Sequence, residues 1–180
     1  MSYYYFAASL PMLIPEQPPP FSVESFRHQC ASHLGPHDLA AMDELLGGEP
    51  APQPHAFARR WQVADSHLRN AVARTRSERM RKDSGAYTRD VEGVDTSIDR
   101  DVADAYSRPT PLEREKAIDR IRWRRLEEIG GLDPFTADAV LAYGVQLTIL
   151  ERWARMDEET GAATVNALVE RNPADKEDKS

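Results

Sequence analysis

The chain has 180 residues, of which 41% are hydrophobic and 29% charged, and its formal net charge is −7. This length suits one domain, and the acidic balance argues against a nucleic-acid binder. No run of about 18 apolar residues exists that could span a membrane. Cys30 is the only cysteine, which excludes an intramolecular disulfide and a thiolate metal cage.

The first 21 residues are aromatic and then rich in proline. Residues 3–10 could form one short strand or one short helix, and the pattern does not decide between them. Residues 15–20 predict an extended link, because each proline removes a backbone donor and crowds the preceding turn. The apolar start lacks the basic flank of a secretory signal, so we expect an unprocessed, cytoplasmic protein.

Three helices are predicted before residue 83 from apolar side chains that recur every three or four residues. The first follows the N-cap Ser22 and carries Cys30 on its apolar face. The second covers residues 36–46, between the pairs Gly35-Pro36 and Gly47-Gly48. The third and longest covers residues 54–82 and is expected to stop at Ser84-Gly85.

Four more helices are predicted in the second half, over residues 99–106, 112–129, 137–153 and 157–171. Thr136 is the expected N-cap of the third of these. Residues 139–150 are the most apolar stretch of the chain. A helix that is apolar nearly all round packs on several sides, so we expect this one at the centre.

The sequence therefore predicts an all-α fold, a helical bundle of about six to seven helices with an extended, proline-rich N-terminal segment. We expect a single helical domain over residues 1–173. If it divides, the lobes are 1–82 and 99–173, joined by the connection 83–98. The charged tail 174–180 is predicted to be disordered.

A search for catalytic and ligand-binding patterns finds none. There is no His-Glu-x-x-His motif and no acidic calcium loop, and the double glycines follow helices instead of opening a phosphate loop. Cys30 on an apolar helix face is more typical of a small core residue than of a nucleophile. We therefore predict no catalytic residue, no metal ligand, no cofactor and no small-molecule substrate.

Charge is distributed unevenly along the chain. Residues 54–82 hold eight basic and two acidic side chains, a net of +6, and residues 83–106 hold seven acidic and two basic ones, a net of −5. The two segments could pair with each other, or an acidic partner could dock on the basic helix. The second interpretation names Arg69, Arg74, Arg76, Arg79 and Arg81 as partner-binding residues.

Two segments resemble a known family. Residues 3–11, YYYFAASLP, followed by residues 18–26, are similar to the start of a bacterial family associated with V/A-type rotary ATPases. That family resembles a shortened form of the funnel-shaped subunit of their central stalk. Residues 139–153, AVLAYGVQLTILERW, resemble the helix of that subunit in which an apolar stretch leads to a charged motif with an arginine.

The resemblance implies a non-catalytic coupling subunit that links the central axle of the motor to its membrane rotor ring. Its partners would be the axle and the ring. The protein would be cytoplasmic and peripheral at the inner face of the cell membrane, and no nucleic acid is expected. Tyr143 and Arg152 of the similar helix join the predicted partner-binding residues. The full-length stalk protein is about twice as long, so a complete three-lobed socket is not expected.

Two alternatives stay open. One is a helical adaptor that binds nucleic acid or an acidic protein through the basic helix 54–82. The other is a small helical enzyme, for which Tyr143, Glu151 and Arg152 would be the residues to test, because they are polar near one end of the most buried helix.

Overall fold

The computed structural model describes residues 3–81 and 96–171, which form seven α-helices and no strand. The all-α prediction is therefore confirmed. No described helix has the length and apolar character needed to cross a bilayer. The helices are α1 (Tyr4–Ser9), α2 (Val23–His33), α3 (Pro36–Leu45), α4 (Ala56–Met80), α5 (Thr96–Tyr106), α6 (Pro111–Gly130) and α7 (Ala137–Arg171).

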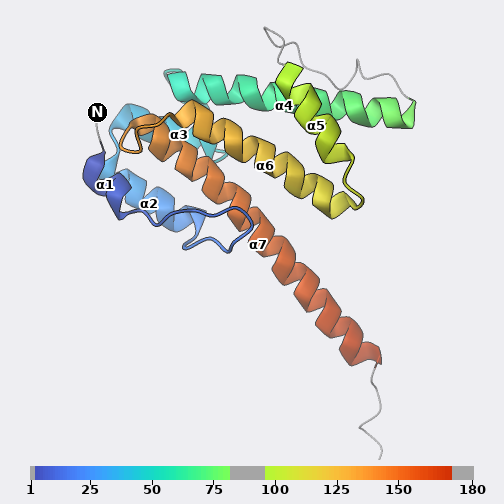
Figure 1. Ribbon diagram of the computed structural model, residues 1–180. Coiled ribbons are helices and arrows are strands. Elements are labelled where there is room, and N and C mark those ends of the chain that lie inside the picture. The colour runs from blue at the N-terminus through green and yellow to red at the C-terminus, as the bar shows by residue number, and fades with distance from the viewer. Residues whose placement is uncertain (1–2, 82–95, 172–180) are drawn as a thin grey trace, which may run out of the picture.

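Helices α6 and α7 pack side by side and form the centre of the molecule (Figure 1). On one side, α4 and α5 pack against α6 and against each other. On the other side, α2 and α3 pack against α7. The far half of α7 projects beyond the other helices (Figure 1). The central position predicted for residues 137–153 agrees with this arrangement.

Two clusters of buried apolar side chains hold the helices together. The larger joins α1, α2, α3, the first half of α7 and parts of α4 and α6, with Phe26, Cys30, Met42 and Leu147 fully buried in it. The smaller joins α4, α5 and α6. Its buried members are Leu68, Ala71, Ile98, Val102, Ala105, Tyr106, Ile118 and Ile121. Each cluster takes residues from both sides of the interval 82–95.

The N-terminal residues are fixed against α6 and α7. Residues 4–9 form a helix, which settles the choice left open by the sequence, and the amide of Tyr3 donates to the carbonyl of Phe135 at 2.7 Å. Residues 10–22 then cross the surface without regular structure. The Glu16 carboxylate in this segment forms ion pairs with Arg120 and Lys116 of α6.

The predicted N-caps are confirmed. Ser22 Oγ accepts from the amide of Ser25 at 3.1 Å, and Thr136 Oγ1 accepts from the amide of Ala139 at 3.2 Å. These contacts satisfy amides that have no partner within the helix.

One prediction was wrong, because residues 137–153 and 157–171 form a single helix instead of two. The three residues between them are alanine, arginine and methionine, which are good helix formers, and no glycine or proline interrupts them. Three helix starts shift by one to three residues, to Ala56 for α4, Thr96 for α5 and Pro111 for α6, and α4 ends at Met80, two residues before the predicted end. The predicted stop at Ser84-Gly85, most of the connection 83–98 and the tail 174–180 lie outside the described residues.

Candidate partner-binding groove

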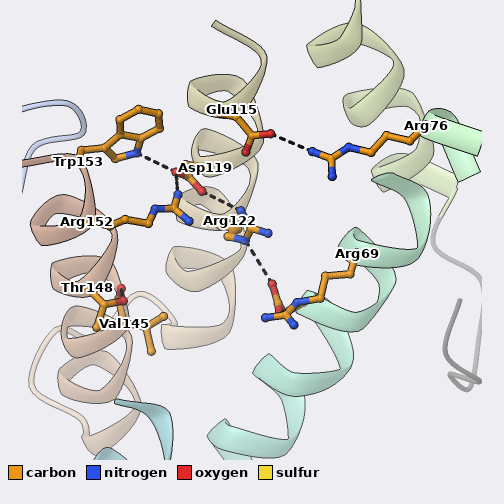
Figure 2. Close-up of polar contacts among 10 residues, drawn as sticks. Arg69, Arg76, Glu115, Asp119, Arg122, Val145, Thr148, Arg152 and Trp153 are labelled. Carbon is orange, nitrogen blue, oxygen red and sulfur yellow. Dashed lines mark hydrogen bonds and ion pairs between the residues drawn. The ribbon is translucent and has the colours of Figure 1, made fainter. Parts of the chain in front are cut away.

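A groove opens between α4, α6 and α7, with a volume of about 570 Å³. Four arginines from the three helices line it: Arg69, Arg76, Arg122 and Arg152. Apolar side chains make up most of the remaining wall, and among the described residues Glu115 is the one acidic side chain in the lining. We call this feature the arginine groove; Figure 2 shows its charged residues.

The positions of four lining residues follow from the periodicity of α4. Intervals of three and four residues relate Arg69, Val72, Ala73 and Arg76, so these side chains share one face of that helix. This places two apolar side chains between two arginines. The side chains of Arg69 and Arg76 are 59% and 56% exposed, so both guanidinium groups are open to solvent.

Asp119 of α6 organises the base of the groove. Its side chain is only 6% exposed, and it accepts from Arg122 at 2.8 Å, from the indole of Trp153 at 2.8 Å and from Arg152 (Figure 2). One carboxylate thus joins α6 to α7. Burial of an unpaired carboxylate would be costly, and these three donors compensate for the loss of water.

Arg122 extends this network to α4. Its guanidinium contacts Asp119 and, through Nε at 3.2 Å, Asp65 of α4. Burial disfavours the charged form of Arg122, but the two carboxylates outweigh burial and raise the pKa of Arg122 above its ordinary value. The side chain therefore stays charged. We call Asp65, Asp119, Arg122, Arg152 and Trp153 the Asp119 network.

Two further ion pairs lie at the mouth of the groove. Arg69 pairs with Asp65 at 2.6 Å, and Arg76 pairs with Glu115 at 3.0 Å. Arg76 also donates through Nε to the hydroxyl of Tyr106 at 2.6 Å. Because both arginines are exposed, each pair contributes little to stability, and its arginine can exchange one carboxylate for another at small cost.

Only three of the predicted partner-binding residues meet in the groove: Arg69, Arg76 and Arg152. Arg74 pairs with Asp99 of α5 at 2.5 Å, and Arg79 donates to the carbonyl of Tyr106 at 2.7 Å. Arg74 is thus neutralised by a residue of the acidic segment, as the self-pairing interpretation predicts.

Arg81 follows the end of α4 in a left-handed conformation, with φ at 53°, and does not line the groove. Tyr143 lies elsewhere: its hydroxyl donates to the carbonyl of Pro11 at 3.0 Å, and burial raises its pKa to about 12. Tyr143 therefore holds the N-terminal segment on α7, a role that the sequence did not suggest.

Three charged residues were not predicted from the sequence: Glu115 and Arg122, which line the groove, and the buried Asp119 behind it. The spacing of Asp119 and Arg122, three residues apart on a predicted helix, was a usable signal for an ion pair on one face. Nothing local indicated that Asp65 and Arg152, far away in the sequence, would join them.

The three side chains named for the enzyme alternative do not converge. Glu151 accepts from the amide of Val23 at 3.2 Å, at the start of α2. Arg152 points to Asp119 and Tyr143 to Pro11. Cys30 is fully buried, and burial with the nearby charge of Asp43 raises the pKa of its thiol to about 12. A thiol in this state is a poor nucleophile at neutral pH.

A second cluster of possible ligand atoms lies away from the groove, at His37, Asp38 and His55. It does not fit a metal ion. Nδ1 of His55 accepts from the amide of Phe57 at 3.1 Å, so the proton of the neutral ring is on Nε2, which faces Asp38 at 3.3 Å. A metal-binding nitrogen needs a free lone pair, and this one carries the proton. His55 instead caps the start of α4, with Asp38 beside its Nε2.

Comparisons with known proteins add one match. Residues 99–174 match the model of a family described as "Protein of unknown function (DUF2764)". The match includes most of α5 and all of α6 and α7, and hence Glu115, Asp119, Arg122 and Arg152, but not α4. The chain has no match among curated proteins or among solved structures.

Proposed function

We propose that this chain is a non-catalytic coupling subunit of a V/A-type rotary ATPase, which links the central axle to the membrane rotor ring. The observation that carries the proposal is the arginine groove. The Asp119 network beside this groove joins three helices, and the groove offers two exposed arginines, Arg69 and Arg76, to a partner. A coupling protein of this kind needs such rigid, charged contact surfaces and no reactive group.

The packing of the two segments that resemble the family supports the proposal. The N-terminal segment and the helix around Tyr143 are far apart in sequence, but they contact through Tyr143 and Pro11. Phe26, in the second part of the N-terminal similarity, packs against Tyr143 with ring centroids 5.1 Å apart. The resemblance therefore concerns one packed unit. In this role the protein is peripheral to the inner face of the membrane and is held there by its partners.

Purification of the tagged chain from native membranes in mild detergent tests the proposal. Mass spectrometry should find axle, rotor-ring and catalytic-head subunits with the wild-type chain and with Arg74→Gln, which alters α4 outside the groove. The tag alone controls for nonspecific recovery. If these subunits are no more abundant than in the tag control, the proposed function is wrong.

The second candidate function is a helical adaptor for an acidic protein. Arg69 and Arg76 favour it because they face a groove with apolar walls. The nucleic-acid version has less support, since Arg60 and Arg74 of α4 already pair with Asp138 and Asp99. The adaptor predicts a soluble acidic partner in the purification and no rotary ATPase subunits.

A further inference from the structure

The exposed face of α4 in the groove has a repeating order. Arg69 is followed one turn later by Val72 and Ala73, then by Arg76, and then by Met80, whose surface is 61% exposed. Charged and apolar side chains thus alternate by turns. Arg69 and Arg76 are seven residues apart, which corresponds to about 10 Å along the helix axis.

Within the described part of the chain, the two arginines retain donors for a second acidic group. A guanidinium carries five N–H groups. The contact with Asp65 engages Nε of Arg69, and those with Tyr106 and Glu115 engage Nε and one terminal nitrogen of Arg76. Both side chains are more than half exposed, so an incoming carboxylate can reach them.

The walls formed by α6 and α7 also contribute apolar and positively charged side chains. Ile118 of α6 also lines the groove but is only 4% exposed, so Val72 and Ala73 form most of the accessible apolar patch between the two arginines of α4. Arg152 of α7 adds a third positive charge, 46% exposed. A ligand that fits must offer negative charge on both sides of an apolar patch. A phosphate or another small anion would leave that patch uncovered.

A nucleic acid fits less well. Glu115 within the groove and the net charge of −7 oppose a phosphate backbone. An amphipathic helix fits better, because its side chains seven residues apart have the same axial spacing as Arg69 and Arg76, and those three and four residues along fall between them.

We infer that the arginine groove binds an acidic amphipathic helix of a partner protein. Two carboxylates of this helix, seven residues apart, pair with Arg69 and Arg76, and the apolar side chains between them cover Val72 and Ala73. The incoming carboxylate at Arg76 competes with Glu115, which already pairs with that arginine in the free protein.

This inference rests on the proposed function in one respect, namely that the chain acts by holding a partner. Its experiment needs only the purified chain and a synthetic peptide. A failed peptide experiment therefore leaves the membrane purification unaffected, and a failed purification does not decide whether the groove binds an acidic helix.

The probe is a fluorescein-labelled helical peptide of about 14 residues, with glutamates seven apart and leucines three and four residues after the first of them. Fluorescence anisotropy at low salt, where charge pairs are least screened, measures its dissociation constant. Two matched control peptides are used: one has glutamine in place of both glutamates, and the other has serine in place of both leucines. Both should bind at least about fivefold more weakly.

Two variants of the chain are expected to change the affinity for the acidic peptide in opposite directions. The double variant Arg69→Gln/Arg76→Gln should weaken binding about tenfold. Asp65 loses Arg69 in this variant but still pairs with Arg122, so its carboxylate is not left without a partner. Glu115→Gln should strengthen binding about two- to fivefold, because it removes the internal competitor for Arg76. Arg74→Gln, on the same helix but paired with Asp99, should change nothing.

Circular dichroism and thermal midpoints establish that the variants fold like the wild type. The inference is overturned if the acidic peptide binds no better than its glutamine counterpart, or if Glu115→Gln fails to strengthen binding. Equal displacement of the peptide by inorganic phosphate or by a single-stranded oligonucleotide of the same charge would also overturn it, since the groove would then recognise charge alone.

Discussion

At the scale of single residues, Asp119 is the most heavily used side chain of the groove. Its two oxygens accept hydrogen bonds from donors on α6 and α7. Arg122, one of these donors, also pairs with Asp65 of α4. A buried carboxylate with several donors adds little net stability over an apolar residue, but removal of one member leaves the others without compensation.

We expect Asp119→Asn to lower the free energy of unfolding by about 2–4 kcal/mol. The amide keeps the shape of the side chain but removes the charge that Arg122 and Arg152 face, and it brings an NH₂ group into a site that needs only acceptors. Urea denaturation followed by circular dichroism measures the change.

The matched control is Asp99→Asn, which removes the carboxylate of the exposed pair with Arg74. It should cost less than about 1 kcal/mol. Similar losses in the two variants would contradict the importance assigned to the Asp119 network.

At the scale of elements, the sequence predicted most helices because their signals are local. Ser22 and Thr136 cap the helices as expected, and the break at Gly35-Pro36 separates α2 from α3. The predicted division of α7 was wrong because the charged stretch after Trp153 contains no helix breaker, and charge alone does not end a helix. The groove itself could not be predicted, since it depends on how α4, α6 and α7 meet.

Gly144 is a point of close approach between α7 and the neighbouring helices. A β-carbon built there would lie 2.5 Å from Sδ of Met42 and 3.1 Å from Cε1 of Phe26, and both side chains are fully buried. Alanine is favoured over glycine in a helix by about 1 kcal/mol, but overpacking costs about 1–3 kcal/mol. We expect Gly144→Ala to lower the free energy of unfolding by about 1 kcal/mol net.

A double-mutant cycle identifies the cause. In a Met42→Ala background the crowding at Sδ is gone, so Gly144→Ala should become neutral or stabilising by up to about 1 kcal/mol. Chemical denaturation of the four proteins gives the coupling. If Gly144→Ala destabilises both backgrounds equally, Met42 is not what restricts position 144.

At the scale of the whole molecule, the two apolar clusters share their helices. α4 contributes Phe57 to the larger cluster and Leu68 to the smaller, and α6 contributes Leu126 and Ile118 in the same way. A helix that enters both clusters couples their unfolding. We therefore expect the chain to unfold as one cooperative unit.

Leu68→Ala and Leu147→Ala test this expectation, since each truncates a buried leucine in a different cluster. Each should lower the free energy of unfolding by about 2–5 kcal/mol and leave a single transition, which helical circular dichroism and tryptophan fluorescence report at the same denaturant concentration. Two separated transitions in the Leu68→Ala protein would show that the clusters unfold independently.

The projection of α7 has a mechanical consequence. At about 1.5 Å per residue, the part of this helix beyond Trp153, which ends at Arg171, extends about 27 Å from the packed half. A rotation of the bundle by about 5° would displace that end by about 2 Å, and a continuous helix transmits the movement without an intervening hinge. The same helix carries Arg152 at the groove, so a small tilt of α7 there would produce a larger displacement at its far end.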